Sequence, residues 1–83
     1  MYAVHYSNRA ESEVRKLPRG AQLRILRKVE GLKDNPRPYG VRKIEGSDDL
    51  YRIRDGDYRI IYAIDDRRGS VMVWGVAHRG EAY

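Results

Sequence analysis

The sequence predicts an α+β domain in which a short strand and two helices precede a series of antiparallel strands. Apolar residues recur at helical spacing between residues 8 and 32, and alternation typical of strands fills the stretch from 41 to 77. The chain has 83 residues, which is enough for one domain, 1–83. We therefore expect one sheet with the helices packed on one of its faces.

The first element is a short strand over residues 1–6. Its alternation puts Tyr2, Val4 and Tyr6 on one face and leaves His5 on the other. Ser7 or Asn8 then provides a side chain suited to cap the start of a helix. His5 is therefore expected at the surface rather than in a site.

Two short helices should follow as an antiparallel pair. In the first helix, apolar residues recur at Ala10, Val14 and Leu17, and Pro18 ends it with Gly20 in the break. The second helix continues to about residue 32 and carries its own apolar stripe, formed by Ala21, Ile25, Val29 and Leu32. These stripes should face the sheet.

A loop rich in proline and glycine, residues 34–40, separates the helices from four further strands. We expect these strands at residues 41–45, 50–54, 57–64 and 71–77. The last one is apolar on both faces, which is typical of an interior strand. Its tryptophan, Trp74, is therefore expected in the core.

The strongest local signal is Asp55-Gly56 between two strands, which predicts a two-residue type I′ hairpin turn. Such a turn would place Arg52 opposite Arg59, with Arg54 on the same face. The other face would carry apolar residues for the helices: Tyr51, Ile53, Tyr58, Ile60 and Tyr62.

Like charges across a strand pair are unfavourable, and an anion held over these arginines would relieve their repulsion. Three solvated arginines on an exposed sheet face are the alternative, and the pattern leaves both open. Asp57, at the tip, could offset one of the three charges.

Charge and composition narrow the class of function. Lys and Arg total 17 against 12 Asp and Glu, a net charge of +5, and thirteen of the bases are arginine. Arginine binds phosphate through a planar fork, although a genomic preference for arginine would explain the ratio equally well. With no cysteine and two histidines, we expect no disulfide, no metal site and no cofactor.

Without a long apolar run or a signal peptide, we expect a cytoplasmic protein without a membrane segment.

The last strand leads into His78 and Arg79, and the chain ends at Tyr83. Whichever face His78 and Arg79 take, they should emerge near Asp57 and Arg59. Arginine can stabilise charge on a phosphate, histidine can move a proton near neutral pH, and tyrosine can stack on a base. This set suits phosphodiester chemistry.

Several segments, in this order and at this spacing, resemble the RelE/ParE superfamily of type II toxin–antitoxin toxins, on the RelE side. They are Lys43-Ile44-Glu45-Gly46, residues 50–54 and 57–62, His78-Arg79 and Tyr83. The resemblance covers nearly the whole chain. It implies a metal-independent endoribonuclease that cleaves mRNA in the ribosomal A site, where a 2′-hydroxyl attacks the neighbouring phosphate. It also implies an antitoxin, the ribosome and mRNA as partners.

The same resemblance implies residue roles. Arg52 and Arg54 match basic positions, Arg59 matches a phosphate-holding arginine, and Arg79 matches a proton donor or charge stabiliser. Lys43 would contact RNA phosphate, Tyr83 would orient or stack on the substrate, and His78 matches a position that is histidine in some members.

The general base is left open by these matches. Some relatives have lysine in place of Arg52, and arginine is a poor base because it stays protonated. His78 is therefore the candidate for base, or equally for acid. A ParE-like inhibitor of DNA gyrase and a non-catalytic RNA-binding relative remain the alternatives to an RNA-cleaving toxin.

A toxin of this class must be silenced by its antitoxin. The basic first half of the chain suggests an acidic antitoxin segment. We expect it to contact Arg24, Arg27 and Lys28 on the exposed side of the second helix, for which a simply solvated surface is the alternative.

Overall fold

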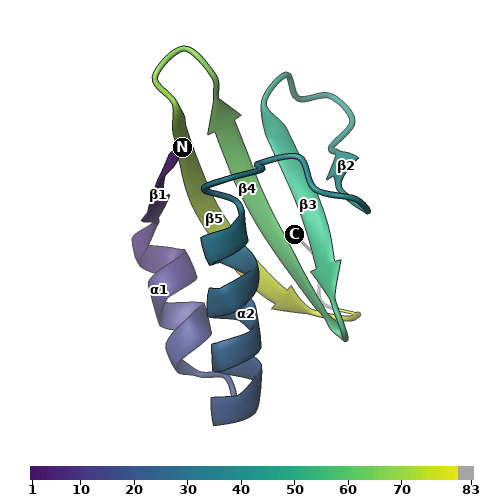
Figure 1. Cartoon of the computed structure of the whole chain (residues 1–83). Helices are drawn as coiled ribbons and strands as arrows, with labels where there is room; N and C mark the ends of the chain where they lie inside the picture. Colours follow the sequence, from purple (N-terminus) through teal and green to yellow (C-terminus); the bar gives the residue numbers. More distant parts are fainter. Residues whose placement is uncertain (81–83) are drawn as a thin grey trace.

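A computed structural model of the chain describes residues 1–80 and confirms the α+β class. The element order is β1 (Ala3–Tyr6), α1 (Asn8–Arg15), α2 (Arg19–Gly31), β2 (Arg42–Lys43), β3 (Leu50–Asp55), β4 (Tyr58–Asp65) and β5 (Ser70–His78). Both helices lie side by side across one face of the sheet, called here the helix face (Figure 1). The opposite face is called the rear face. Over residues 1–80, neither helix has the length and apolar character needed to cross a membrane.

The five strands form one mixed sheet in the order β1-β5-β4-β3-β2. β1 pairs in parallel with β5, and the other neighbours are antiparallel. β5 is an interior strand, as predicted. Where β1 ends, α1 takes over that edge: the Ser7 hydroxyl donates to the Trp74 carbonyl at 2.9 Å, and Glu13 accepts the Val76 N–H at 2.8 Å. Such capping protects an exposed strand edge.

The helix boundaries follow the sequence signals closely. Ser7 is the N-cap of α1, and its hydroxyl accepts the Ala10 N–H at 3.0 Å. Pro18 is the N-cap of α2. The expectation for Gly20 was wrong: it lies inside α2 rather than in the break, because α2 begins directly after Pro18.

The core lies between the helices and the helix face of the sheet. Tyr62 is fully buried there, and its hydroxyl donates to the Pro36 carbonyl at 2.8 Å, which holds the loop after α2 against the sheet. As predicted, the same layer contains residues of α2 and its C-cap, of β3 and of β4: Ile25, Val29, Leu32, Ile53 and Ile60. This packing fixes which side of β3 and β4 is left for the rear face.

The predicted hairpin turn was wrong by one position. Asp55 pairs with Tyr58, so the two turn residues are Gly56 and Asp57. Gly56 has φ +60° and is the only one of the two with positive φ, as a type II′ turn requires, whereas type I′ needs positive φ at both. Asp55 stays in β3, where its carboxylate accepts from Arg24 of α2 at 3.0 Å. The observed register is therefore accompanied by a contact between two residues that are far apart in the sequence, Arg24 and Asp55.

The register consequently differs from the prediction by two residues. Arg59 lies opposite Arg54 rather than Arg52, and Arg52 lies opposite Ile61. An even shift keeps every side chain on its predicted face, so Arg52, Arg54 and Arg59 still share the rear face.

Trp74 was expected in the core, and this expectation was wrong. Its side chain is 48% exposed. Ile61 pairs with Gly75 and Tyr62 with Val73, so Trp74 is the extra residue of a β-bulge in β5. The preceding residue, Val73, is buried on the helix face, and successive side chains of a strand alternate. Trp74 therefore lies on the rear face, which α1 and α2 do not cover.

Candidate functional site

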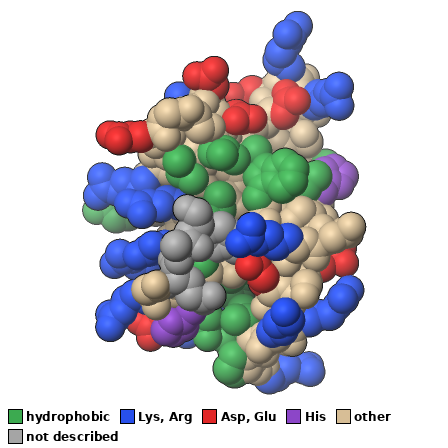
Figure 2. Space-filling view, turned by 180° about the vertical axis from the view of Figure 1, so that it is seen from behind, with side chains coloured by type: hydrophobic (Ala, Val, Ile, Leu, Met, Phe, Trp, Pro, Cys, Tyr) green, Lys and Arg blue, Asp and Glu red, His purple; other side chains and the backbone are tan. Residues whose placement is uncertain are grey.

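Four arginines gather on the rear face and form what we call the arginine cluster: Arg42, Arg52, Arg54 and Arg59. Arg42 of β2 lies opposite Arg52 of β3, and Arg54 of β3 lies opposite Arg59 of β4. All four line a hollow of about 430 Å³, together with Gly40 and Ile53. Figure 2 shows Lys and Arg side chains gathered along one side of this face.

The arginine cluster has no counter-charge within the described part of the chain. None of its four guanidinium groups forms an ion pair or hydrogen bond with a side chain of residues 1–80. Asp57, the acid expected to offset one charge, lies instead 4.0 Å from Arg79. Two like-charge pairs directly across strands lower the stability of the fold. The hollow is therefore a site of concentrated positive charge suited to an anion.

Arg37, on the helix side of the sheet, is by contrast paired. Arg37 contacts both carboxylate oxygens of Asp66, at 3.2 and 2.9 Å, and its guanidinium lies 5.2 Å from the centre of the Tyr51 ring. Hydrogen bonds from Arg37 and then from the Tyr2 hydroxyl hold the pKa of Asp66 below its usual value. These contacts tie the loop after α2 to the β4–β5 turn.

His78 lies at the hairpin end of β5 but on the helix side. It pairs with Tyr58, and the two rings meet edge-on with centroids 5.2 Å apart. Ala77, not His78, lies opposite Arg59. The bulge at Trp74 causes this, since one extra residue moves every later side chain of β5 to the other face. His78 and the arginine cluster are thus at the same end of the sheet on different faces.

Arg79 emerges beside the hairpin turn, as expected. Its backbone N–H donates to the Asp57 carbonyl at 2.6 Å, and its side chain is exposed. The chain after β5 is therefore anchored to the tip of the β3–β4 hairpin. Tyr83, the remaining residue of the expected site, lies outside the described residues.

Lys43 and Arg42 occupy opposite sides of β2. Lys43 pairs with Tyr51, which belongs to the helix side, so Lys43 does not line the hollow. Arg42 does, and the sequence interpretation missed it. Its partner on β3 is set by the conformation of residues 44–49, for which the sequence offers no turn signal as specific as Asp-Gly.

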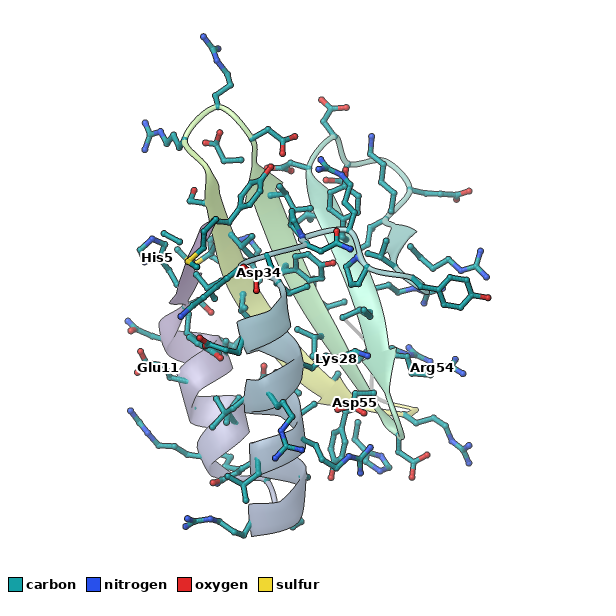
Figure 3. The ribbon with its side chains drawn as sticks, in the orientation of Figure 1. His5, Glu11, Lys28, Asp34, Arg54 and Asp55 are labelled. Carbon is teal, nitrogen blue, oxygen red and sulfur yellow. The ribbon has the colours of Figure 1, made fainter. Side chains whose placement is uncertain are left out.

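The expected antitoxin contacts line a second hollow, of about 320 Å³, between α2 and β3. Arg24, Arg27 and Lys28 provide its basic side, and the rest is formed by Gly31, Leu32, Pro38 and Asp55. Arg24 is already paired with Asp55, so Arg27 and Lys28 carry the net charge here. In Figure 3, Asp55 points toward α2 while Arg54 points away from it. The two hollows therefore lie on either side of β3.

Within residues 1–80, His, Asp and Glu side chains form no group of three or more that could hold a metal ion. The lining of the arginine hollow consists of arginines, a glycine and an isoleucine. The chemistry available there is anion binding and charge stabilisation.

The fold is that of a known class of toxin. The family model described as "ParE toxin of type II toxin-antitoxin system, parDE" matches residues 4–83. The chain therefore belongs to the RelE/ParE family of type II toxin–antitoxin toxins.

Among the proteins similar to this chain are several RelE toxins. Toxin RelE of Mycobacterium tuberculosis is 31% identical over 83 residues, covering 99% of this chain and 86% of that protein. In the archaeal RelE–RelB complex from Pyrococcus horikoshii OT3, the matching chain is 31% identical, with a TM-score of 0.85 and 98% of both chains covered. The intact E. coli RelBE toxin–antitoxin complex matches at 28% identity and a TM-score of 0.81, over 99% of this chain and 100% of that one.

Proposed function

We propose that this toxin is a ribosome-dependent endoribonuclease that cleaves mRNA in the A site. A 2′-hydroxyl loses its proton and attacks the adjacent phosphorus, and the bond from phosphorus to the 5′-oxygen breaks. The 5′-oxygen takes up a proton, so the products are a 2′,3′-cyclic phosphate and a 5′-hydroxyl. The observation that supports this proposal best is the arginine cluster around the hollow on the rear face, which has no ion-pair partner among residues 1–80.

Within the arginine cluster, the arginines nearest the hairpin turn would hold the scissile phosphate and stabilise the negative charge that grows on its oxygens. Arg54 and Arg59 are the central pair, because they lie directly opposite one another beside the hairpin turn. Arg79 follows β5 at the same end and would stabilise the leaving oxygen. Fixed positive groups of this kind contribute most when charge develops in the transition state.

Among residues 1–80, the charged side chains that line the hollow are all arginine, and arginine does not act as a base near neutral pH. We therefore assign positioning and charge stabilisation, rather than proton removal, to the arginine cluster. His78 could act as base or acid only on a substrate that reaches round the end of the sheet, because it faces Tyr58. The absence, among residues 1–80, of a proton-transferring side chain beside these arginines is consistent with a need for the ribosome, which would supply the missing group.

We further propose that an antitoxin silences the toxin through the hollow at α2. Relatives of this fold have been crystallised as RelE–RelB and RelBE complexes. Arg27 and Lys28 have no ion-pair partner among residues 1–80, and their charges beside Leu32 and Pro38 suit a partner segment with acidic and apolar side chains.

The decisive experiment uses purified ribosomes carrying a defined mRNA in the A site. We expect the toxin to cut the message, and a single 2′-deoxy nucleotide at the mapped position to abolish that cut, because the attacking hydroxyl is then absent. A DNA gyrase supercoiling assay runs beside it, since the matching family model carries the ParE name. Inhibition of gyrase with no ribosomal cleavage would contradict the proposal.

A further inference from the structure

We propose that the arginine cluster binds two successive phosphates of one RNA strand, one phosphate at Arg54 and Arg59 and the next at Arg42 and Arg52. The proposal rests on the proposed function in taking RNA as the ligand of this hollow. It adds a second phosphate subsite and a positioning role for Arg42.

The register of the sheet divides the arginine cluster into two pairs. Arg42 lies opposite Arg52, and Arg54 lies opposite Arg59. Arg52 and Arg54 are two residues apart on β3, so they share a face and their Cα atoms are about 7 Å apart. This is close to the spacing of successive phosphates in an extended single strand.

The charge of the site favours two phosphates over one. A phosphodiester carries one negative charge and offers two free oxygens, which two guanidinium groups satisfy. A single phosphate at Arg54 and Arg59 would leave Arg42 and Arg52 opposed and uncompensated, because neither has an ion-pair partner among residues 1–80. A second phosphate bound at Arg42 and Arg52 would relieve the repulsion between them, as the first phosphate does at Arg54 and Arg59.

The shape of the hollow is also suited to a strand rather than a lone ion. Its volume of about 430 Å³ is lined by all four arginines at once. Gly40 lies on its wall with open space at the position of a Cβ, so an RNA backbone can approach the protein there. Figure 2 shows the rear face on which this path lies.

The test compares two short RNAs that cannot be cleaved because every 2′-hydroxyl is methylated. A dinucleotide carries one phosphodiester and a trinucleotide carries two. For the wild-type toxin we expect the trinucleotide to bind roughly tenfold more tightly, as an added charge-assisted contact provides. The slope of log affinity against log salt should be steeper for the trinucleotide by about 0.7.

Arg42→Ala should remove the advantage of the trinucleotide and leave the affinity for the dinucleotide unchanged. The matched control is Arg67→Ala, which removes the same charge from an exposed arginine in the β4–β5 turn. Equal losses in both variants, or a trinucleotide that binds no better than a dinucleotide, would overturn the two-phosphate site.

These binding measurements do not depend on cleavage. The two-phosphate site can therefore be refuted while the proposed ribonuclease activity holds, and the activity can be refuted while the two-phosphate site holds. If the ribosomal assay shows cleavage, Arg42→Ala should raise KM about tenfold with little change in kcat, as expected for a residue that positions the strand. A loss confined to kcat would contradict a positioning role.

Discussion

The two faces of the β3–β4 hairpin come from the same residues in alternation, yet they are built differently. On the helix face, Ile53 and Ile60 are buried and the charge of Asp55 is paired with Arg24. On the rear face, Arg54 and Arg59 are opposed and have no ionic partner among residues 1–80. One face lowers the free energy of folding, and the other raises it slightly to prepare an anion site. Substitutions on the two faces should therefore separate stability from activity.

The largest expected effect is on the helix face. Ile60 is fully buried, so Ile60→Ala should lower the free energy of unfolding by about 2–5 kcal/mol through lost burial and the cavity left behind. Urea titration followed by circular dichroism measures this change. Cleavage per folded molecule should be retained, and its loss at unchanged stability would contradict the division between the faces.

A smaller effect is expected at the α2 hollow, where the charges of Arg27 and Lys28 border an apolar patch. Arg27→Glu should weaken antitoxin binding roughly tenfold, because a favourable surface pair becomes a repulsion, and this loss should shrink as salt screens it. Arg19→Glu, at the exposed start of the same helix, is the control. Calorimetric titration in two salt concentrations tests the prediction. An affinity indifferent to salt and to Arg27→Glu would indicate a purely apolar groove.

The smallest effect concerns the pairing of Asp66 with Arg37 and Tyr2. The pKa of Asp66 is lowered in the folded state, so its contribution to stability is complete above the unfolded pKa of about 3.9 and is lost as pH falls through the folded value. Asp66→Asn should therefore lower the melting temperature at pH 7 and flatten its decline between pH 5 and pH 3. An unchanged acid profile would show that the exposed pairing adds nothing.

The faces could be predicted from the sequence because strand alternation has a period of two. Arg52, Arg54 and Arg59 kept their face even though the turn moved by one position and the register by two. The register itself could not be predicted, because the turn type depends on Gly56 and is accompanied by the contact between Asp55 and Arg24, distant in the sequence.

Two parts of the candidate site were beyond the reach of sequence patterns. Arg42 enters the cluster through the conformation of residues 44–49, which no local signal fixes. His78 leaves the arginine face because of the bulge at Trp74. Gly75, beside the bulge, is the one local hint in the sequence, but a glycine inside a strand permits a bulge without requiring one. The sequence therefore predicted which residue types the site contains better than it predicted their arrangement.

The central claim is that the rear-face arginines serve the substrate and not the fold, and Arg59→Ala tests it most directly when ribosomal cleavage and thermal unfolding are measured on the same preparation. We expect cleavage to fall on the order of 10²-fold, as when a stabiliser of transition-state charge is lost, while the melting temperature stays level or rises because Arg54 loses its opposed charge. Arg59→Lys should restore cleavage only in part, since a point charge cannot replace the planar fork. A large loss of stability with cleavage per folded molecule intact would show that Arg59 is structural and would contradict the account.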